Sequence, residues 1–396
     1  MQIPDYVGAS AFGLKMGVVL PGSDLQELIM ERMRVVNNDG LLHDKDVLCV
    51  TESVVARSQN NYVTTNDTAE EVKSKLNLDN GKKVGVLFPI ASRNRFSLIM
   101  EGIARAVPDG EVVVQLSYPR DEVGNQIISE ELANEITSEH GGVIDSDKID
   151  RSFAHPITGV DYVQLYKDII TENGAKPVII LSNDPLEILN HQPEGVIVAD
   201  IHTKEKHHRM LESRLGNCCT LQEFFGEKNG PGSGKAWSEF GLLGSNMSSQ
   251  GRLKLAPYRA EEFAVELQDA IKEETGKNVE VIVYGDGAYK DPSSSIYELA
   301  DPYPAFGATP GVRGVYREGV KYKYLVDLHH DQGKSETEIE SELEKQSAQK
   351  RAQNDIAAEG TTPRRMEDVL ASLADLVSGS ADAGTPLVLI KGIYQS

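Results

Sequence analysis

Acidic side chains follow one apolar strand of this sequence at the place where α/β proteins bind ligands. The β-branched run 279–284 leads directly into Gly285, Asp286 and Asp291, and Glu298 follows seven residues after Asp291. Ligands sit beyond the carboxyl ends of strands in open α/β sheets, and the glycines on both sides of Asp286 let the backbone approach a ligand closely. Carboxylate oxygens suit Mg²⁺ or Mn²⁺, so the pattern predicts a divalent metal site. A solvated turn is the alternative, because Asp-Gly pairs are common turn formers.

A second group of polar residues follows the apolar run 46–51. Glu52, Ser53 and Arg57 come directly after this predicted strand, where they could meet a nucleotide or a cation. The alternative is a helix start with an acid in its first turn and ordinary surface charge, because acids suit that position.

The middle of the chain offers a weaker set of candidates. Asp200 directly follows the apolar run 195–199, so it is a second-rank acidic candidate by the same strand-end argument. Three histidines and a glutamate follow it, namely His202, His207, His208 and Glu205. They raise a zinc hypothesis, but their spacing fits no metalloprotease or zinc-finger pattern, and a solvated helix face explains them more simply. The glycine-rich run 229–236 lacks the first glycine and the final Ser or Thr of a phosphate-binding P-loop, so we reject that interpretation.

The elements that must position these residues alternate between strand and helix patterns. Apolar residues at helical spacing predict helices over residues 24–36 and 259–274, while apolar runs predict strands over 18–20, 83–88, 111–116, 177–181, 195–199, 324–327 and 386–390. This alternation indicates an α/β (α+β) fold with a mixed sheet flanked by helices. We divide the chain into a core made of residues 1–118 and 235–396, and an inserted, smaller α/β lobe at 119–234.

The charge and cysteine content restrict the class of protein. The chain of 396 residues carries 40 basic and 61 acidic side chains, a net charge of -21, which argues against general electrostatic binding to nucleic acid. Three cysteines are too few for a disulfide framework, so a reducing cytoplasm is the expected compartment. The sequence begins without an export signal pattern and has no apolar run long enough to span a membrane.

Several segments resemble the family of coenzyme F420 gamma-glutamyl ligases, which attach glutamate to a deazaflavin coenzyme precursor. The resemblance covers about the first 60 residues, the part from Gly241 to Tyr284 and the C-terminus. It is carried by Gly13-Leu14, the runs 21–29 and 47–57, Gly244-Ser-Asn246 with 253–257, the run 273–286, and Lys391-Gly392. Arg57 stands where the family has lysine, and Asn246 stands where we expect its metal-binding aspartate.

The resemblance implies an amide ligase that uses GTP (or ATP) and Mn²⁺ or Mg²⁺, acts on a small-molecule acceptor and an amino acid, and forms a homodimer. It implies nucleotide binding by Leu14, Glu52, Ser53 and Arg57, metal binding by Asn246, Asp286, Asp291 and Glu298, and catalytic roles for Asp286 and Arg57. Two other functions stay open: a non-catalytic nucleotide- or metabolite-binding homologue, and a metal-dependent phosphoester hydrolase using the same acids.

Overall fold

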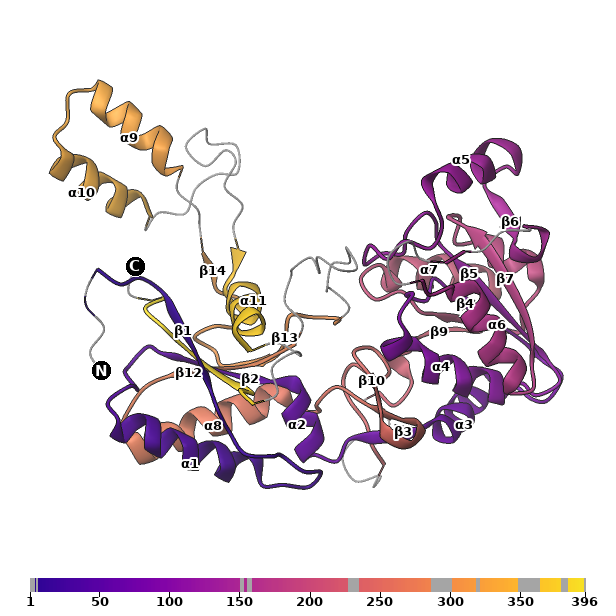
Figure 1. Cartoon of the computed structure of the whole chain (residues 1–396), viewed down its shortest axis with the longest axis horizontal. Coiled ribbons are helices and arrows are strands. Elements are labelled where there is room, and N and C mark those ends of the chain that lie inside the picture. The colour runs from indigo at the N-terminus through magenta and orange to yellow at the C-terminus, as the bar shows by residue number, and fades with distance from the viewer. Residues whose placement is uncertain are drawn as a thin grey trace.

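The chain forms two α/β lobes joined by a small three-stranded sheet (Figure 1). The computed structural model describes residues 4, 6–149, 153–154, 159–226, 235–285, 301–317, 321–347, 364–378 and 384–394. The helices and mixed parallel and antiparallel strands confirm the predicted α/β class.

The first lobe is built on a five-stranded mixed sheet. Its strands, in spatial order, are β1 (Ser10–Leu14), β16 (Leu387–Lys391), β2 (Val47–Thr51), β12 (Glu280–Tyr284) and β13 (Ala305–Ala308). Strands β2 and β12 are parallel, whereas β16 is antiparallel to both β1 and β2. It follows that β1, β2 and β12 run in the same direction and end at the same edge of the sheet.

Helices cover both faces of this sheet, which is why its strands are apolar at nearly every position. On one face, α1 (Leu25–Asn38) and α8 (Ala260–Thr275) pack against Leu48, Val50 and their neighbours. On the other face, α11 (Met366–Ser378) packs against Val47 and Cys49. The short helix α2 (Glu52–Ser58) leaves the end of β2 toward the second lobe.

The second lobe contains a six-stranded sheet. Its strands, in spatial order, are β6 (Val143–Asp145), β7 (Lys176–Ser182), β5 (Glu111–Leu116), β4 (Lys83–Leu87), β8 (Gly195–Val198) and β9 (Cys218–Thr220). All neighbours are parallel except β6 with β7. One face is covered by α3 (Thr65–Leu76), α4 (Arg93–Ala106), α5 (Glu130–Glu139) and α6 (Tyr162–Glu172), and the other by α7 (Lys204–Leu215).

The sheet pairing differs from the division that we predicted at residue 118. Strands β4 and β5, which we assigned to the core, pair with β8 and β7 of the segment 119–234. The second lobe therefore begins near Thr65, after β3 (Tyr62–Thr64). The apolar runs of β4 and β5 could not reveal this, because such a run fits the buried centre of either sheet.

The remaining elements connect or extend the lobes. Strands β10 (Asn246–Ser248), β11 (Arg252–Lys254) and β3 form the three-stranded sheet between the lobes, and β14 (Tyr316–Arg317) pairs with β15 (Arg364–Arg365). Helices α9 (Tyr322–Asp331) and α10 (Glu336–Ser347) form a hairpin around Leu325 and Ile339.

Two of the predicted strands are wrong. Residues 324–327 belong to helix α9, because an apolar run of four residues cannot distinguish a strand from a helix turn. Residues 18–20 lie in a loop in which Val18 and Leu20 are exposed, and the first strand is instead β1.

Candidate functional site

Polar residues gather at the edge of the five-stranded sheet where β1, β2 and β12 end. Leu14 closes β1 and is joined to β2 through β16, because Leu387 pairs with both Leu14 and Val50. On the other side of β2, Tyr284 pairs with Thr51. The chain therefore brings Leu14, Glu52 and Gly285 to one edge of the sheet. The strand-end argument predicted this edge for Glu52 and Gly285, whereas Leu14 was implied only by the family resemblance.

Glu52 begins α2 at this edge and forms a buried ion pair with Lys254. The Lys254 Nζ atom lies 2.9 Å from Glu52 Oε1 and 2.7 Å from Oε2, and the side chains are 8% and 10% exposed. An ammonium group has three N–H donors. Among the described residues no other group accepts a hydrogen bond from Lys254, so this ion pair leaves one donor for a ligand.

Asn246 lies beside Lys254 on the three-stranded sheet. The two residues are directly opposite each other in the antiparallel pair β10–β11, so their side chains lie on the same face. The Asn246 Oδ1 atom accepts a hydrogen bond of 3.0 Å from Asn94 Nδ2. Asn94 is an exposed residue in the first turn of α4, so the N-terminus of this helix faces the three-stranded sheet.

A second ion pair joins the two lobes next to the first. Arg95, on α4, places its Nη1 atom 2.7 Å from Asp301 Oδ1, and the two side chains are 11% and 4% exposed. Asp301 also lies against Gly285, since a Cβ atom at Gly285 would stand 2.3 Å from Asp301 Oδ2. The backbone at Gly285 can approach Asp301 this closely because glycine has no side chain.

The two ion pairs influence each other electrostatically. Burial raises the pKa of Glu52 above its usual value, the positive charge of Lys254 opposes that shift, and the negative charge of Asp301 adds to it. Desolvation disfavours the ionised form of a carboxyl group, whereas a nearby cation favours it. The cluster of Glu52, Lys254, Arg95 and Asp301, which we call the junction cluster, therefore depends on its two cations to hold two buried carboxylates.

The structure brings some predicted site residues together and separates others. Ser53 and Arg57 are one helical turn apart, so they lie on the same face of α2, and Glu52 lies on a different face. Arg57 is exposed, and its side chain makes no ion pair or hydrogen bond with the described part of the chain. Asn246 lies near Glu52, because Lys254 is directly opposite Asn246 on the sheet and forms the ion pair with Glu52. The predicted metal ligands Asp286, Asp291 and Glu298 lie outside the described residues.

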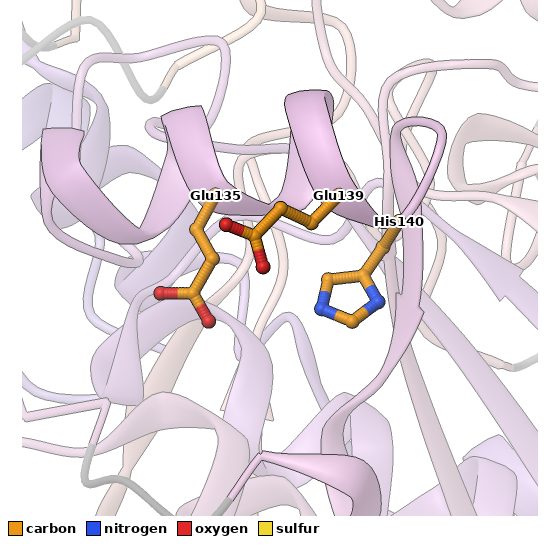
Figure 2. A group of neighbouring side chains, drawn as sticks. All are labelled: Glu135, Glu139 and His140. Carbon is orange, nitrogen blue, oxygen red and sulfur yellow. The ribbon is translucent and has the colours of Figure 1, made fainter.

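One group of side chains in the described part of the chain has the spacing of a metal site, and it is elsewhere. Glu135, Glu139 and His140 place ligand atoms within 4.8 Å of one another at the end of α5 (Figure 2). Glu139 and His140 are exposed. Exposed acids on one helix turn are common without a metal, so this geometry alone assigns no function.

The sequence prediction missed the cations of the junction cluster. Lys254 lies between Leu253 and Leu255, and a lysine inside an apolar run is a signal of a buried, paired charge. Arg95 and Asp301 carry no comparable signal, because they are 206 residues apart and meet only when α4 packs against the first lobe.

These features describe an α/β protein with two lobes, in which buried cations lie beside amide groups at the strand ends where the lobes meet. The family model for F420-0:gamma-glutamyl ligase matches residues 13–392, nearly the whole chain, and the chain belongs to this family. A comparison with curated proteins gives no match. In the described residues, every helix is too short or too polar to cross a membrane.

Proposed function

We propose that this chain is a ligase that joins glutamate, or a similar amino acid, to a small-molecule carboxylate through an amide bond, at the expense of GTP or ATP and with Mn²⁺ or Mg²⁺. Membership of the gamma-glutamyl ligase family supports the reaction class. The observation that carries the proposal is the buried pair of Glu52 and Lys254 at the carboxyl edge of β2, with a donor of Lys254 left for an anionic ligand.

The proposed reaction has two steps. An oxygen of the acceptor carboxylate attacks the γ-phosphorus of the nucleotide, and the nucleoside diphosphate leaves with the electrons of the broken P–O bond. The amine nitrogen of the amino acid then attacks the carbonyl carbon of the acyl phosphate, loses a proton and displaces phosphate. In both steps negative charge builds up on oxygen atoms in the transition state. Fixed cations in a site with little water stabilise these transition states most strongly.

The chain offers such cations at the junction cluster. Lys254 would contact a phosphate or the acceptor carboxylate, and Glu52 would be a positioning residue that fixes the ammonium group. Arg57 would bind phosphate or carboxylate from the exposed face of α2, where its planar guanidinium can make two parallel hydrogen bonds. Leu14 and Ser53 would line the nucleotide site at the same sheet edge.

The described residues of the junction do not by themselves form a ligand set for a divalent cation. Both oxygens of Glu52 are bonded to Lys254, and Asn246 Oδ1 already accepts from Asn94. The proposed dependence on Mn²⁺ or Mg²⁺ rests on Asp286, Asp291 and Glu298, with the second lone pair of Asn246 Oδ1 as a neutral ligand beside its hydrogen bond from Asn94. We also propose a homodimer.

The test is phosphate release from GTP and ATP with Mn²⁺ or Mg²⁺, with and without glutamate and a pool of small carboxylates. Release that requires both glutamate and a carboxylate supports the ligase. Release that ignores glutamate indicates a phosphoester hydrolase, and nucleotide binding without release under all conditions indicates a non-catalytic homologue. Either of the last two results overturns the proposal.

Three variants test the roles of Lys254 and Asp286. Lys254→Met should lower kcat/KM at least tenfold relative to the unmodified protein. Lys254→Arg should lower it less, because the reaction requires a cation at this position and arginine keeps one. Asp286→Ala should abolish metal-dependent turnover. Unchanged metal-dependent turnover in Asp286→Ala would refute the metal assignment but not the role of Lys254.

A further inference from the structure

The second lobe has a strand-order reversal of its own, in a sheet that the proposed reaction does not use. From β4 the chain moves outward through β5 to β7, and it then returns to the other side of β4 with β8 and β9. The strand order therefore reverses between β4 and β8. In doubly wound parallel sheets, ligands bind outside the carboxyl ends of the strands at this reversal.

Asp200 lies at this reversal, two residues after β8, and is 1% exposed. Its Oδ2 atom accepts a hydrogen bond of 2.6 Å from Thr203 Oγ1 and lies 3.1 Å from His207 Nδ1. Its Oδ1 atom is buried and has no hydrogen-bond partner. Buried polar atoms are nearly always paired, so an unpaired oxygen on a buried carboxylate indicates a ligand that satisfies it.

Glu122 brings a second carboxylate to the same place from the loop after β5. It accepts a short hydrogen bond from the Ile201 amide and one of 3.1 Å from the His202 amide. Thr203 Oγ1, which donates to Asp200, also lies 3.5 Å from Glu122 Oε2. Burial raises the pKa of Glu122, and the charge of Asp200 raises it further, so the two carboxylates repel each other.

We propose that Asp200 and Glu122 bind a divalent cation of the Mg²⁺ or Mn²⁺ class in the second lobe. Such cations are held by one or two carboxylates and keep several waters. Thr203 and His207 hold Asp200 Oδ2, which fixes the direction of Oδ1, and ligating carboxylates are commonly oriented by such partners. The cation would satisfy the unpaired oxygen and neutralise the repulsion at once.

Among the described basic groups near the two carboxylates, His207 contacts Asp200, Lys204 has another partner and His202 lies at the surface. The Lys204 ammonium donates to the Ile201 carbonyl at 3.1 Å, and His202 is exposed. His207 points its Nδ1 atom at Asp200 and packs edge-on against Phe88. The site shares no residue with the junction cluster, so it stands or fails independently of the proposed function.

The experiment counts Mn²⁺ bound per chain by electron paramagnetic resonance, using the whole protein. We compare the unmodified chain with Asp200→Asn and Glu122→Gln, which remove one negative charge each and keep the side-chain shape. Each variant should bind one Mn²⁺ fewer per chain than the unmodified protein. Each should also show a cooperative thermal unfolding transition, which demonstrates that it is folded. Glu139→Gln, in the exposed group of Figure 2, is the matched control and should bind as many ions as the unmodified chain.

Equal Mn²⁺ counts in the unmodified chain and in Glu122→Gln would overturn the proposal, and so would a loss seen only in Glu139→Gln. If Asp200→Asn does not fold, Glu122→Gln alone decides. An anomalous difference map of the unmodified protein in Mn²⁺ checks the location: a peak between Asp200 and Glu122 supports the site, and peaks only elsewhere refute it.

Discussion

At the scale of single residues, removing one partner of the ion pair of Glu52 and Lys254 should lower the free energy of unfolding strongly, whereas removing both partners should lower it little. Lys254→Met leaves a carboxylate buried without its cation, so we expect a loss of about 3–5 kcal/mol in the free energy of unfolding. The double variant Glu52→Gln/Lys254→Met should lose much less than the sum of the single variants. Urea unfolding of the four proteins in this cycle measures both quantities.

The control for this cycle is an exposed pair of the same charge type. Lys82 and Glu194 lie 3.6 Å apart with side chains 46% and 44% exposed. Solvent screens such pairs, so Lys82→Met should change the unfolding free energy by less than about 1 kcal/mol. Additive losses at Glu52 and Lys254, or losses as small as that of the control, would contradict the burial argument.

The thiol of Cys218 should react slowly at neutral pH although it is only half-buried. Burial, together with the negative charges of Glu223 and Glu212, raises its pKa to about 12. Only the thiolate reacts, so alkylation should accelerate about tenfold per pH unit from pH 7 to 10, without the plateau that an ordinary thiol shows near its pKa of about 8.5.

The measurement for Cys218 is mass-spectrometric mapping of iodoacetamide labelling at several pH values. Because the pKa is raised in the folded state, any stability that this group contributes persists at neutral pH and is lost as pH rises through about 12. Glu223→Gln should increase the labelling rate. A rate that levels off below pH 9 would refute the shift.

At the scale of elements, helix α4 depends on a glycine for its contact with α3. A Cβ atom at Gly102 would stand 2.6 Å from the Thr68 side chain and 3.1 Å from the Thr65 carbonyl. Alanine normally favours a helix over glycine by about 1 kcal/mol, but here overpacking should dominate, so Gly102→Ala should lose about 1–3 kcal/mol of unfolding free energy.

Gly17→Ala is the matched control for Gly102, because nothing lies within 4 Å of its added Cβ atom. Its effect on the urea midpoint should be within about 0.5 kcal/mol. A stabilised Gly102→Ala protein would show that α3 and α4 can separate at no cost.

The elements themselves show what the sequence could predict and what it could not. The spacing of Leu267 and Ile271 predicted α8, and the β-branched run predicted β12, because local periodicity and propensity decide long amphipathic helices and buried strands. Which sheet β4 joins depends on pairing with β8, over 100 residues away, and no local pattern encodes that choice. Likewise, the place of Glu52 after β2 made it a candidate, and the apolar neighbours of Lys254 signal a buried charge, but that these two residues pair follows only from the tertiary fold.

At the scale of the whole molecule, the junction cluster ties two lobes that have separate hydrophobic cores. The buried residues of the five-stranded sheet and those of the six-stranded sheet form distinct clusters. The ion pair of Arg95 and Asp301 and the contact of Asn94 with Asn246 lie where the lobes meet. A ligand that binds between Lys254 and α4 would therefore also stabilise one relative placement of the lobes.

The Arg95→Met variant tests this coupling. It leaves Asp301 buried beside Glu52 without its cation, so the contact between the lobes should weaken more than either core. We expect calorimetry to show two resolved unfolding transitions, or a larger separation of two that already exist. Arg105→Met is the control on the same helix, because Arg105 bonds to Thr65, Asn66 and Asn173 within the second lobe. Arg105→Met should lower only the unfolding temperature of the second lobe. If both variants show the same calorimetric change, α4 acts through the core of the second lobe and not through the junction cluster.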